Sequence, residues 1–181
     1  MNLKNRIIAL ATATAIAVPA LALAKHNMKA DKDHVPTASF AAKLNAGGGI
    51  DGKTADVTIS DDDTNIVIKV DLGRVNTGMT LRNEHFQTKF LKGKKSAVLT
   101  VKKADIKGKK KGTVNGKLKL NDKEKDVKVS YDTSKDGGIL KVTGSTDIKY
   151  TDFGWEKMCY LGVCVEEGVK VSADLYVSPE D

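Results

Sequence analysis

The chain has 181 residues, 40% of them hydrophobic and 29% charged, which fits one folded domain with a substantial core and argues against widespread disorder. Its formal charge of +7 rests on 27 Lys and only 3 Arg, and because base and phosphate recognition relies on Arg forks, we expect no nucleic-acid partner. Three His and two Cys offer little material for a metal site or a catalytic nucleophile, so the composition disfavours most enzymes, and we expect no cofactor.

The N-terminus has the pattern of a secretory signal peptide over residues 1–24. Two basic residues precede an apolar run, and Ala22-Leu23-Ala24 offers a small-x-small cleavage site. We therefore expect cleavage between Ala24 and Lys25 and export of the mature chain. An uncleaved N-terminal membrane anchor is the alternative. Residues 25–36 are polar and are expected to form a flexible lead-in.

From residue 37 to residue 181, apolar and polar residues alternate in segments separated by turn-forming residues. This period of two is typical of antiparallel strands with one apolar face and one solvent-exposed face. The sequence predicts an all-β domain that closes into a barrel, because closure removes exposed strand edges. A two-sheet sandwich is the alternative. The eight expected strands cover residues 38–44, 55–60, 66–72, 96–106, 114–120, 127–131, 140–150 and 169–177.

One segment breaks the alternation. Met79, Phe86 and Phe90 are spaced as on one side of a helix, and Thr80 is a residue type that caps helix N-termini. The spacing predicts a short helix over residues 80–90, inserted between strands.

The stretch from Val75-Asn76-Thr77-Gly78 to Arg82-Asn83-Glu84-His85-Phe86 is the most distinctive in the chain. Together with the Gly112–Leu118 segment and the Thr151-Asp152-Phe153-Gly154 corner, it resembles the YceI-like family over about residues 55–178, although Asn83 stands where the family often has Asp. The resemblance implies an eight-stranded antiparallel lipocalin-like barrel in the periplasm. Its apolar lumen would hold a long isoprenoid chain, such as a polyprenyl pyrophosphate or a quinone tail.

A barrel of eight strands is just wide enough to be packed shut or to hold one slim ligand. The inward positions are mostly Val, Ile and Leu, so the sequence is compatible with an empty tunnel and with a filled core. A filled barrel would fit a structural or stress-related envelope protein with a lysine-rich contact surface. The residues predicted to line the lumen are Ile66, Ile68, Val70, Leu99, Val101, Leu118, Val127, Val129, Leu140, Val142 and Val171.

Arg82 and His85 lie one helical turn apart on the expected helix. They would either anchor the helix to barrel carbonyls or face a ligand head group at the mouth. An enzyme centred on this pair is a remote alternative, because no partner nucleophile is evident.

Cys159 and Cys164 are expected to form a structural disulfide, because both lie in an exported chain. A continuous strand would hold them roughly 17 Å apart, so the chain has to turn, and Gly162 between them permits this. Redox catalysis is disfavoured, since the Cys-x-x-Cys spacing is absent.

The stretch from Lys92 to Lys119 holds eleven Lys and one acid. It is either a solvated charged surface or a contact for an anionic membrane surface. The acidic run Asp61 to Asn65 lacks the later Gly and Glu of a calcium loop, and no metal is expected there. Nothing in the sequence indicates the oligomeric state.

Overall fold

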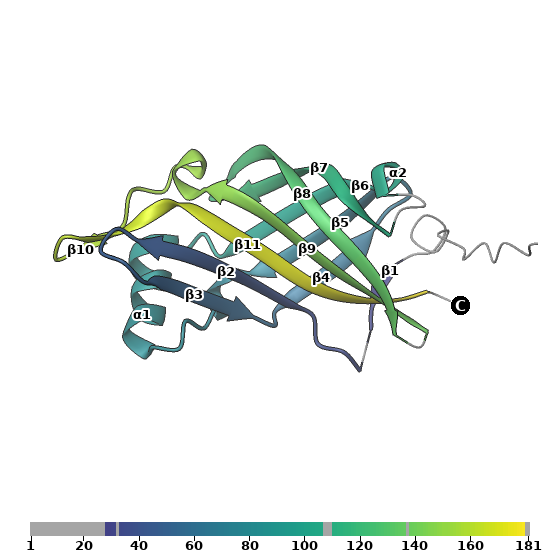
Figure 1. Cartoon of the computed structure of the whole chain (residues 1–181), viewed down its shortest axis with the longest axis horizontal. Coiled ribbons are helices and arrows are strands. Elements are labelled where there is room, and N and C mark those ends of the chain that lie inside the picture. Colours follow the sequence, from purple (N-terminus) through teal and green to yellow (C-terminus); the bar gives the residue numbers. More distant parts are fainter. Residues whose placement is uncertain (1–27, 32, 107–109, 137, 180–181) are drawn as a thin grey trace, which may run out of the picture.

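The computed structural model describes residues 28–31, 33–106, 110–136 and 138–179 (Figure 1). The expected signal peptide and its cleavage site between Ala24 and Lys25 lie outside the described residues, as do residues 25–27 of the expected lead-in. In the part of the chain that is described, no helix is long and apolar enough to cross a lipid bilayer.

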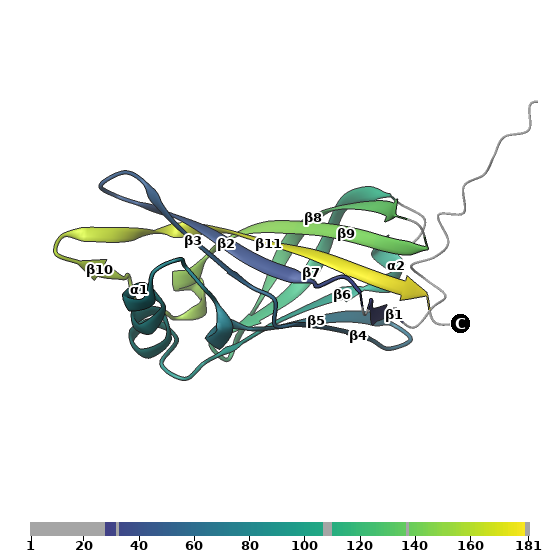
Figure 2. The same ribbon diagram turned by 90° about the horizontal axis from the view of Figure 1, so that it is seen from below.

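One antiparallel sheet curls into a nearly closed barrel, which confirms the all-β barrel expected from the sequence (Figures 1 and 2). The strand order is β3-β2-β11-β9-β8-β7-β6-β5-β4, and β1 and β10 both pair with β11. The strands are β1 (Met28–Ala30), β2 (Thr37–Leu44), β3 (Gly49–Thr54), β4 (Val57–Asp61), β5 (Asn65–Asp71), β6 (Ser96–Lys102), β7 (Lys111–Leu120), β8 (Lys123–Asp136), β9 (Ile139–Lys149), β10 (Cys159–Tyr160) and β11 (Val163–Pro179).

The barrel contains the eight expected strands and three more, β1, β3 and β10. Strand β3 begins at the end of a glycine run, which carries no alternating side chains to reveal it. Strand β1 lies in the segment expected to be a flexible lead-in and pairs with the C-terminal end of β11. For Met28–Ala30 the expectation of a flexible segment was therefore wrong, because backbone pairing at a sheet edge leaves no hydrophobic pattern in the sequence.

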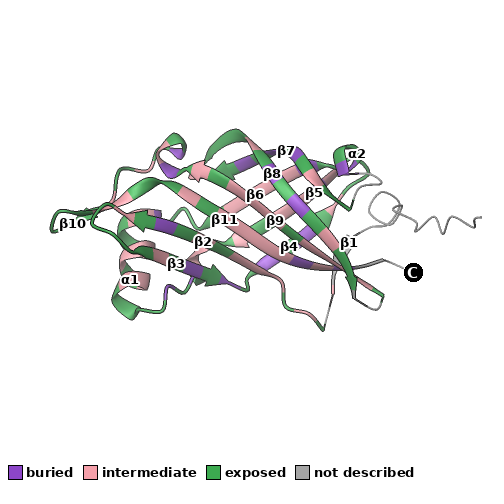
Figure 3. Cartoon of the chain, viewed as in Figure 1, coloured by how far each residue is buried: buried purple, intermediate pink, exposed green. Residues whose placement is uncertain are grey.

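Alternating burial along the strands separates the interior from the solvent (Figure 3). In β7, Val114, Gly116, Leu118 and Leu120 are buried, while the residues between them are largely exposed. Gly116 is needed for close packing, since a Cβ there would lie 2.9 Å from Leu99 Cδ1 on the neighbouring strand. The lysines of β7 consequently face water.

The inserted helix is present and runs without a break from α1 (Thr80–His85) into a π-helix, η3 (Phe86–Leu91). Shorter helical elements are η2 (Leu72–Arg74), α2 (Lys103–Ile106) and η4 (Tyr150–Phe153). Residues 103–106, expected to continue a strand, form α2 instead. The buried Lys103 amine pairs there with the Asp61 carboxylate.

The expected N-cap at Thr80 was wrong. Met79 occupies the capping position and makes no side-chain cap bond. The turn before the helix is held instead by Asn83, whose Oδ1 accepts bonds of 2.7 Å from both the amide and the hydroxyl of Thr77. Asn83 Nδ2 also donates to Asn76 Oδ1 at 3.2 Å.

Replacing Asn83 by Ala is expected to lower the free energy of unfolding by about 2 kcal/mol, because the buried Thr77 loses the acceptor for two donors. Urea denaturation followed by tryptophan fluorescence measures this. Asn83→Asp is the matched control, since it keeps the acceptor oxygen. Equal losses in the two variants would contradict the role assigned to Oδ1.

Candidate functional site: the barrel lumen

A belt of small inward side chains crosses the barrel at its waist. The strand register aligns Gly144 on β9 with Ala173 on β11, and Ala173 with Ala38 on β2. Because three adjacent strands present small residues at the same level, the opposite wall cannot reach them, and space is left between. Tyr131 on β8, a large side chain, lies beside Gly144 and ends the belt on that side.

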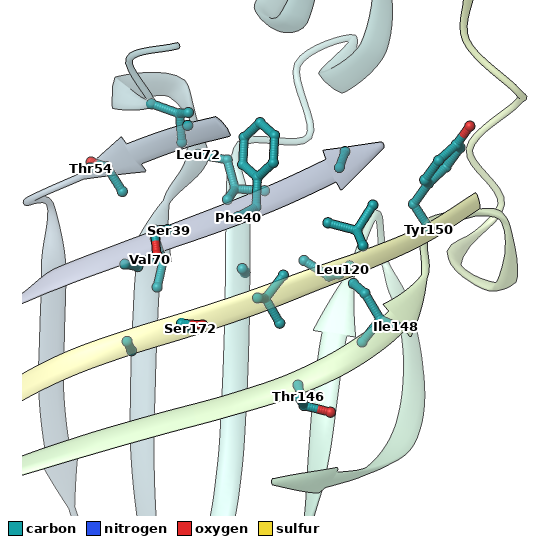
Figure 4. A pocket seen from close by; sticks show the side chains of 18 of the residues that line it. Ser39, Phe40, Thr54, Val70, Leu72, Leu120, Thr146, Ile148, Tyr150 and Ser172 are labelled. Carbon is teal, nitrogen blue, oxygen red and sulfur yellow. The ribbon is translucent and has the colours of Figure 1, made fainter. Parts of the chain in front are cut away.

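A cavity of about 670 Å³ occupies the barrel interior (Figure 4). This volume lies within the range of roughly 300–1,000 Å³ typical of small-molecule sites. Its lining surface is almost entirely apolar, with Val70, Leu120 and Ile148 among the side chains drawn in Figure 4, which also shows Ser39, Thr146 and Ser172. Strands such as β9, with 11 residues, span about 36 Å when extended. The space is therefore long and slim as well as apolar.

The cavity is closed at the end near α2 and open at the end near α1. Ile59, Ile106 and Val177, which line it near α2, are all at least nine-tenths buried. Met79 and Leu161, which line it at the other end, are 54% and 87% exposed. The mouth therefore lies beside α1 and β10, which share one end of the barrel in Figures 1 and 2.

Most of the residues that the sequence assigns to the lumen do face it. Val127 and Leu140 do not line the cavity but pack against the core beside it. Ligand contact at all of these positions stays a prediction. The expected residues that line the cavity are Ile66, Ile68, Val70, Leu99, Val101, Leu118, Val129, Val142 and Val171.

An aromatic cluster near the mouth was missed by the sequence reasoning. Phe90 of η3 is its centre, with its ring 4.5 Å from that of Trp155 and 5.5 Å from that of Phe86. Phe40 on β2 extends the stack from Phe86, and Tyr150 meets Phe90 edge-on. The sequence shows the four-residue spacing of Phe86 and Phe90, but it does not show their aromatic partners, which come from distant segments. The cluster ties the helix to the barrel rim.

Arg82 and His85 both lie at the mouth. Among the described residues that line the cavity, they are the only ones with a side chain able to carry positive charge, and none is Asp, Glu or Lys. Arg82 donates to the Thr77 carbonyl at 3.3 Å, and the His85 ring lies 6.3 Å from that of Tyr160. Arg82 thus braces the loop before its own helix and still borders the opening.

Two polar atoms in the site lack a hydrogen-bond partner, the Tyr131 hydroxyl and Trp155 Nε1. Tyr131 is buried in the apolar interior, which raises the pKa of its phenol above the ordinary value. Both residues line the cavity. Buried polar groups usually find partners, so these two unpaired atoms are exceptions in the wall of the cavity.

Cys159 and Cys164 form the expected disulfide, which closes the hairpin between β10 and β11 beside the mouth. Leu161 and Gly162 make its two-residue turn, both with positive φ. Asn45, which follows β2, joins this hairpin to the neighbouring one. Its backbone N–H donates to the Cys164 carbonyl at 3.0 Å, and its side-chain Oδ1 accepts from the Cys164 backbone N–H at 2.8 Å.

Replacing both Cys159 and Cys164 by Ser is expected to lower the free energy of unfolding by about 2 kcal/mol, the entropy of closing so short a loop. Urea denaturation with and without a thiol reductant measures the effect. The reductant should lower the stability of the unaltered protein and leave the double variant unchanged. If neither the reductant nor the double substitution changed the free energy of unfolding, the hairpin would open independently of the barrel.

The lysines around α2 lie at the closed end, away from the mouth. Residues 107–109, the centre of the lysine-rich stretch, lie outside the described part of the chain.

The acidic run at Asp61 is a turn, in which Asp62 Oδ1 accepts from the amides of Asn65 and Thr64, and these bonds lower the Asp62 pKa. In the residues that the structure describes, no three His, Cys, Asp or Glu are grouped to hold a metal ion.

Comparisons with known proteins agree with this geometry. The sequence matches no functionally curated protein. The fold is similar to a polyisoprenoid-binding domain from Saccharophagus degradans, with a TM-score of 0.68, 14% identity, and coverage of 88% of this chain and 99% of that one. It is also similar to BcnA from Burkholderia cenocepacia, with a TM-score of 0.61, 18% identity, and coverage of 78% and 95%. The model of the YceI-like domain matches residues 26–177, so the chain belongs to the YceI-like family.

Proposed function

We propose that the protein is a non-enzymatic binding protein that sequesters or carries a long isoprenoid chain, polyprenyl or quinone-type, in the barrel lumen. The observation that carries this proposal is the apolar cavity of about 670 Å³, closed at one end and open at the other. Burying apolar surface contributes roughly 25 cal/mol per Å², so a slim hydrocarbon chain gains most by filling such a space. The similar domain from Saccharophagus degradans, described as polyisoprenoid-binding, supports this ligand class.

The arrangement of polar groups supports an orientation with the tail inside and the head group at the mouth. Arg82 and His85 border the opening, and the Arg82 guanidinium suits an anionic or carbonyl-bearing head group. Trp155 Nε1 is a buried, unpaired donor near the aromatic cluster. Toward the deep end, the Tyr131 hydroxyl is a buried polar group without a partner, in a cluster of mostly aliphatic side chains.

A periplasmic location is part of the proposal. Its support is the signal-peptide pattern of residues 1–24 and the disulfide between Cys159 and Cys164, a bond that persists in oxidising compartments. The filled-barrel alternative, an envelope protein that uses its lysines for contact, has less support, because the interior holds a cavity in place of a filled core.

Organic extraction of the protein purified from its native compartment, followed by mass spectrometry, tests the ligand. We expect a long isoprenoid in near-stoichiometric amount. The single tryptophan of the chain lines the cavity, so quenching of its fluorescence by an added quinone with an isoprenoid tail gives an independent titration. If extraction yields no lipid and no isoprenoid quenches Trp155, the proposal fails.

A further inference from the structure

The mouth of the barrel is rimmed by exposed apolar side chains. Six large hydrophobic residues of the described chain are exposed, and every one except Val35 belongs to this rim. Tyr160 and Leu161 stand at the hairpin tip with 68% and 87% of their surface exposed. The remaining three are Met79, Leu81 and Val163.

The rim is also poor in charge, with Arg82 and His85 as the residues at the opening that can carry it. Three seven-residue segments meet there, 44–50, 75–81 and 158–164, and none contains Asp, Glu, Lys or Arg in a chain that is 29% charged. Charged residues flank each of them. Asn45 joins the first segment to the third, and the contact between the rings of His85 and Tyr160 brings the helix beside the third. They therefore form one neutral, partly apolar surface, which we call the rim face.

Leu161 indicates that this exposure costs stability. It has a φ of 49° in a two-residue hairpin turn, a conformation that favours Asn and disfavours Leu. A leucine that is both conformationally strained and 87% exposed stabilises nothing in the isolated protein. Its side chain becomes favourable only when an apolar environment covers it.

We propose that the rim face docks into the interfacial layer of a lipid bilayer, with the cavity mouth held against the lipid. This inference rests on the proposed function for its purpose, since an isoprenoid chain resides in bilayers and must pass between lipid and lumen. The rim residues also line the cavity, so an apolar path would continue from the membrane into the barrel. Tyr together with Leu and Met is a composition suited to the membrane interface.

The charge distribution identifies the occupant and the orientation. Apart from Arg82 and His85 at the opening, the rim carries no charge, so it offers little electrostatic attraction to a charged partner and suits the interfacial layer of a neutral bilayer. The exposed Lys110 and Lys111, at the start of β7, lie at the opposite end of the barrel. Docking through them would turn the mouth away from the membrane. The two modes of contact therefore make opposite predictions about vesicle composition and salt.

Flotation of lipid-extracted protein with vesicles tests the proposal. Binding to pure phosphatidylcholine vesicles is expected, and it should persist at high salt. The variant Leu161→Asn combined with Leu81→Ser should weaken this binding about tenfold or more, because two exposed leucines no longer enter lipid. Leu161→Asn also relieves the strain of the turn, and the urea denaturation midpoint of the double variant is measured to exclude misfolding as the cause of the loss. Val35→Ser, which removes an exposed apolar residue away from the rim, is the matched control and should bind normally.

Several results would overturn the proposal. One is equal binding of the rim variant and the unaltered protein, and another is no binding to neutral vesicles at all. In a third, the protein binds only to phosphatidylglycerol vesicles, and this binding is lost at high salt and in the double variant Lys110→Gln, Lys111→Gln. If the rim variant instead changes the mass measured by sedimentation equilibrium, the rim face joins two copies of the chain. Protein that floats but yields no isoprenoid on extraction would refute the proposed cargo and leave the docking face standing.

Discussion

Replacing Gly144 by Phe is expected to abolish isoprenoid loading while leaving the barrel folded. Gly144 faces the lumen at the waist, and a Cβ built there meets only ordinary contacts, the nearest being Val129 Cγ1 at 3.7 Å. A side chain at this position therefore begins without a clash and points into the cavity. Because the belt of Gly144, Ala173 and Ala38 makes the waist passable, one bulky residue in it should close the path to the deep end.

Two measurements check this result. Lipid released per mole of protein should fall to near zero, and added isoprenoid quinone should no longer quench Trp155. Asp147→Phe, an outward position on the same strand, is the matched control and should load normally. The free energy of unfolding of either variant should change by less than about 2 kcal/mol. Normal loading of Gly144→Phe would show that the ligand does not occupy the lumen below the waist.

The alternation of side chains predicted the strands and most of the wall of the cavity, because in a barrel the buried face of every strand points to one interior. The same reasoning assigned Val127 to the lumen, although it packs against the core beside the cavity. Alternation distinguishes inside from outside, and it carries no information on which inward residue reaches free space.

Whether the lumen is open could not be predicted from single strands. The space depends on register, which brings Gly144, Ala173 and Ala38 to one level although they are far apart in sequence. The aromatic cluster around Phe90 is hidden for the same reason. Strand β3 was missed because Gly52 replaces a pattern-forming side chain, and the structure explains that glycine: a Cβ there would lie 2.4 Å from the ring of Phe40.

Phe153 gives the largest expected effect on stability. Replacing it by Ala should lower the free energy of unfolding by about 3–5 kcal/mol, the usual cost of emptying a buried phenylalanine site. Its side chain is 2% exposed and packs with Leu118 and Leu120 in the smaller of the two hydrophobic clusters. Its carbonyl also accepts a bond of 2.9 Å from Asn121 Nδ2, which holds η4 against the turn between β7 and β8.

Urea denaturation measures this loss, and two further variants identify its cause. Phe153→Leu keeps most of the buried volume and should cost less than half as much. Asn121→Ala removes the bond to the Phe153 carbonyl and should cost about 1 kcal/mol, which separates the packing contribution from the hydrogen bond. Trp155 packs against the same cluster, so its fluorescence should shift in Phe153→Ala even before unfolding. If Phe153→Ala instead retained full stability, the Asp152-Phe153-Gly154 corner would have to act through ligand binding, and isoprenoid loading in that variant would fall without any loss of fold.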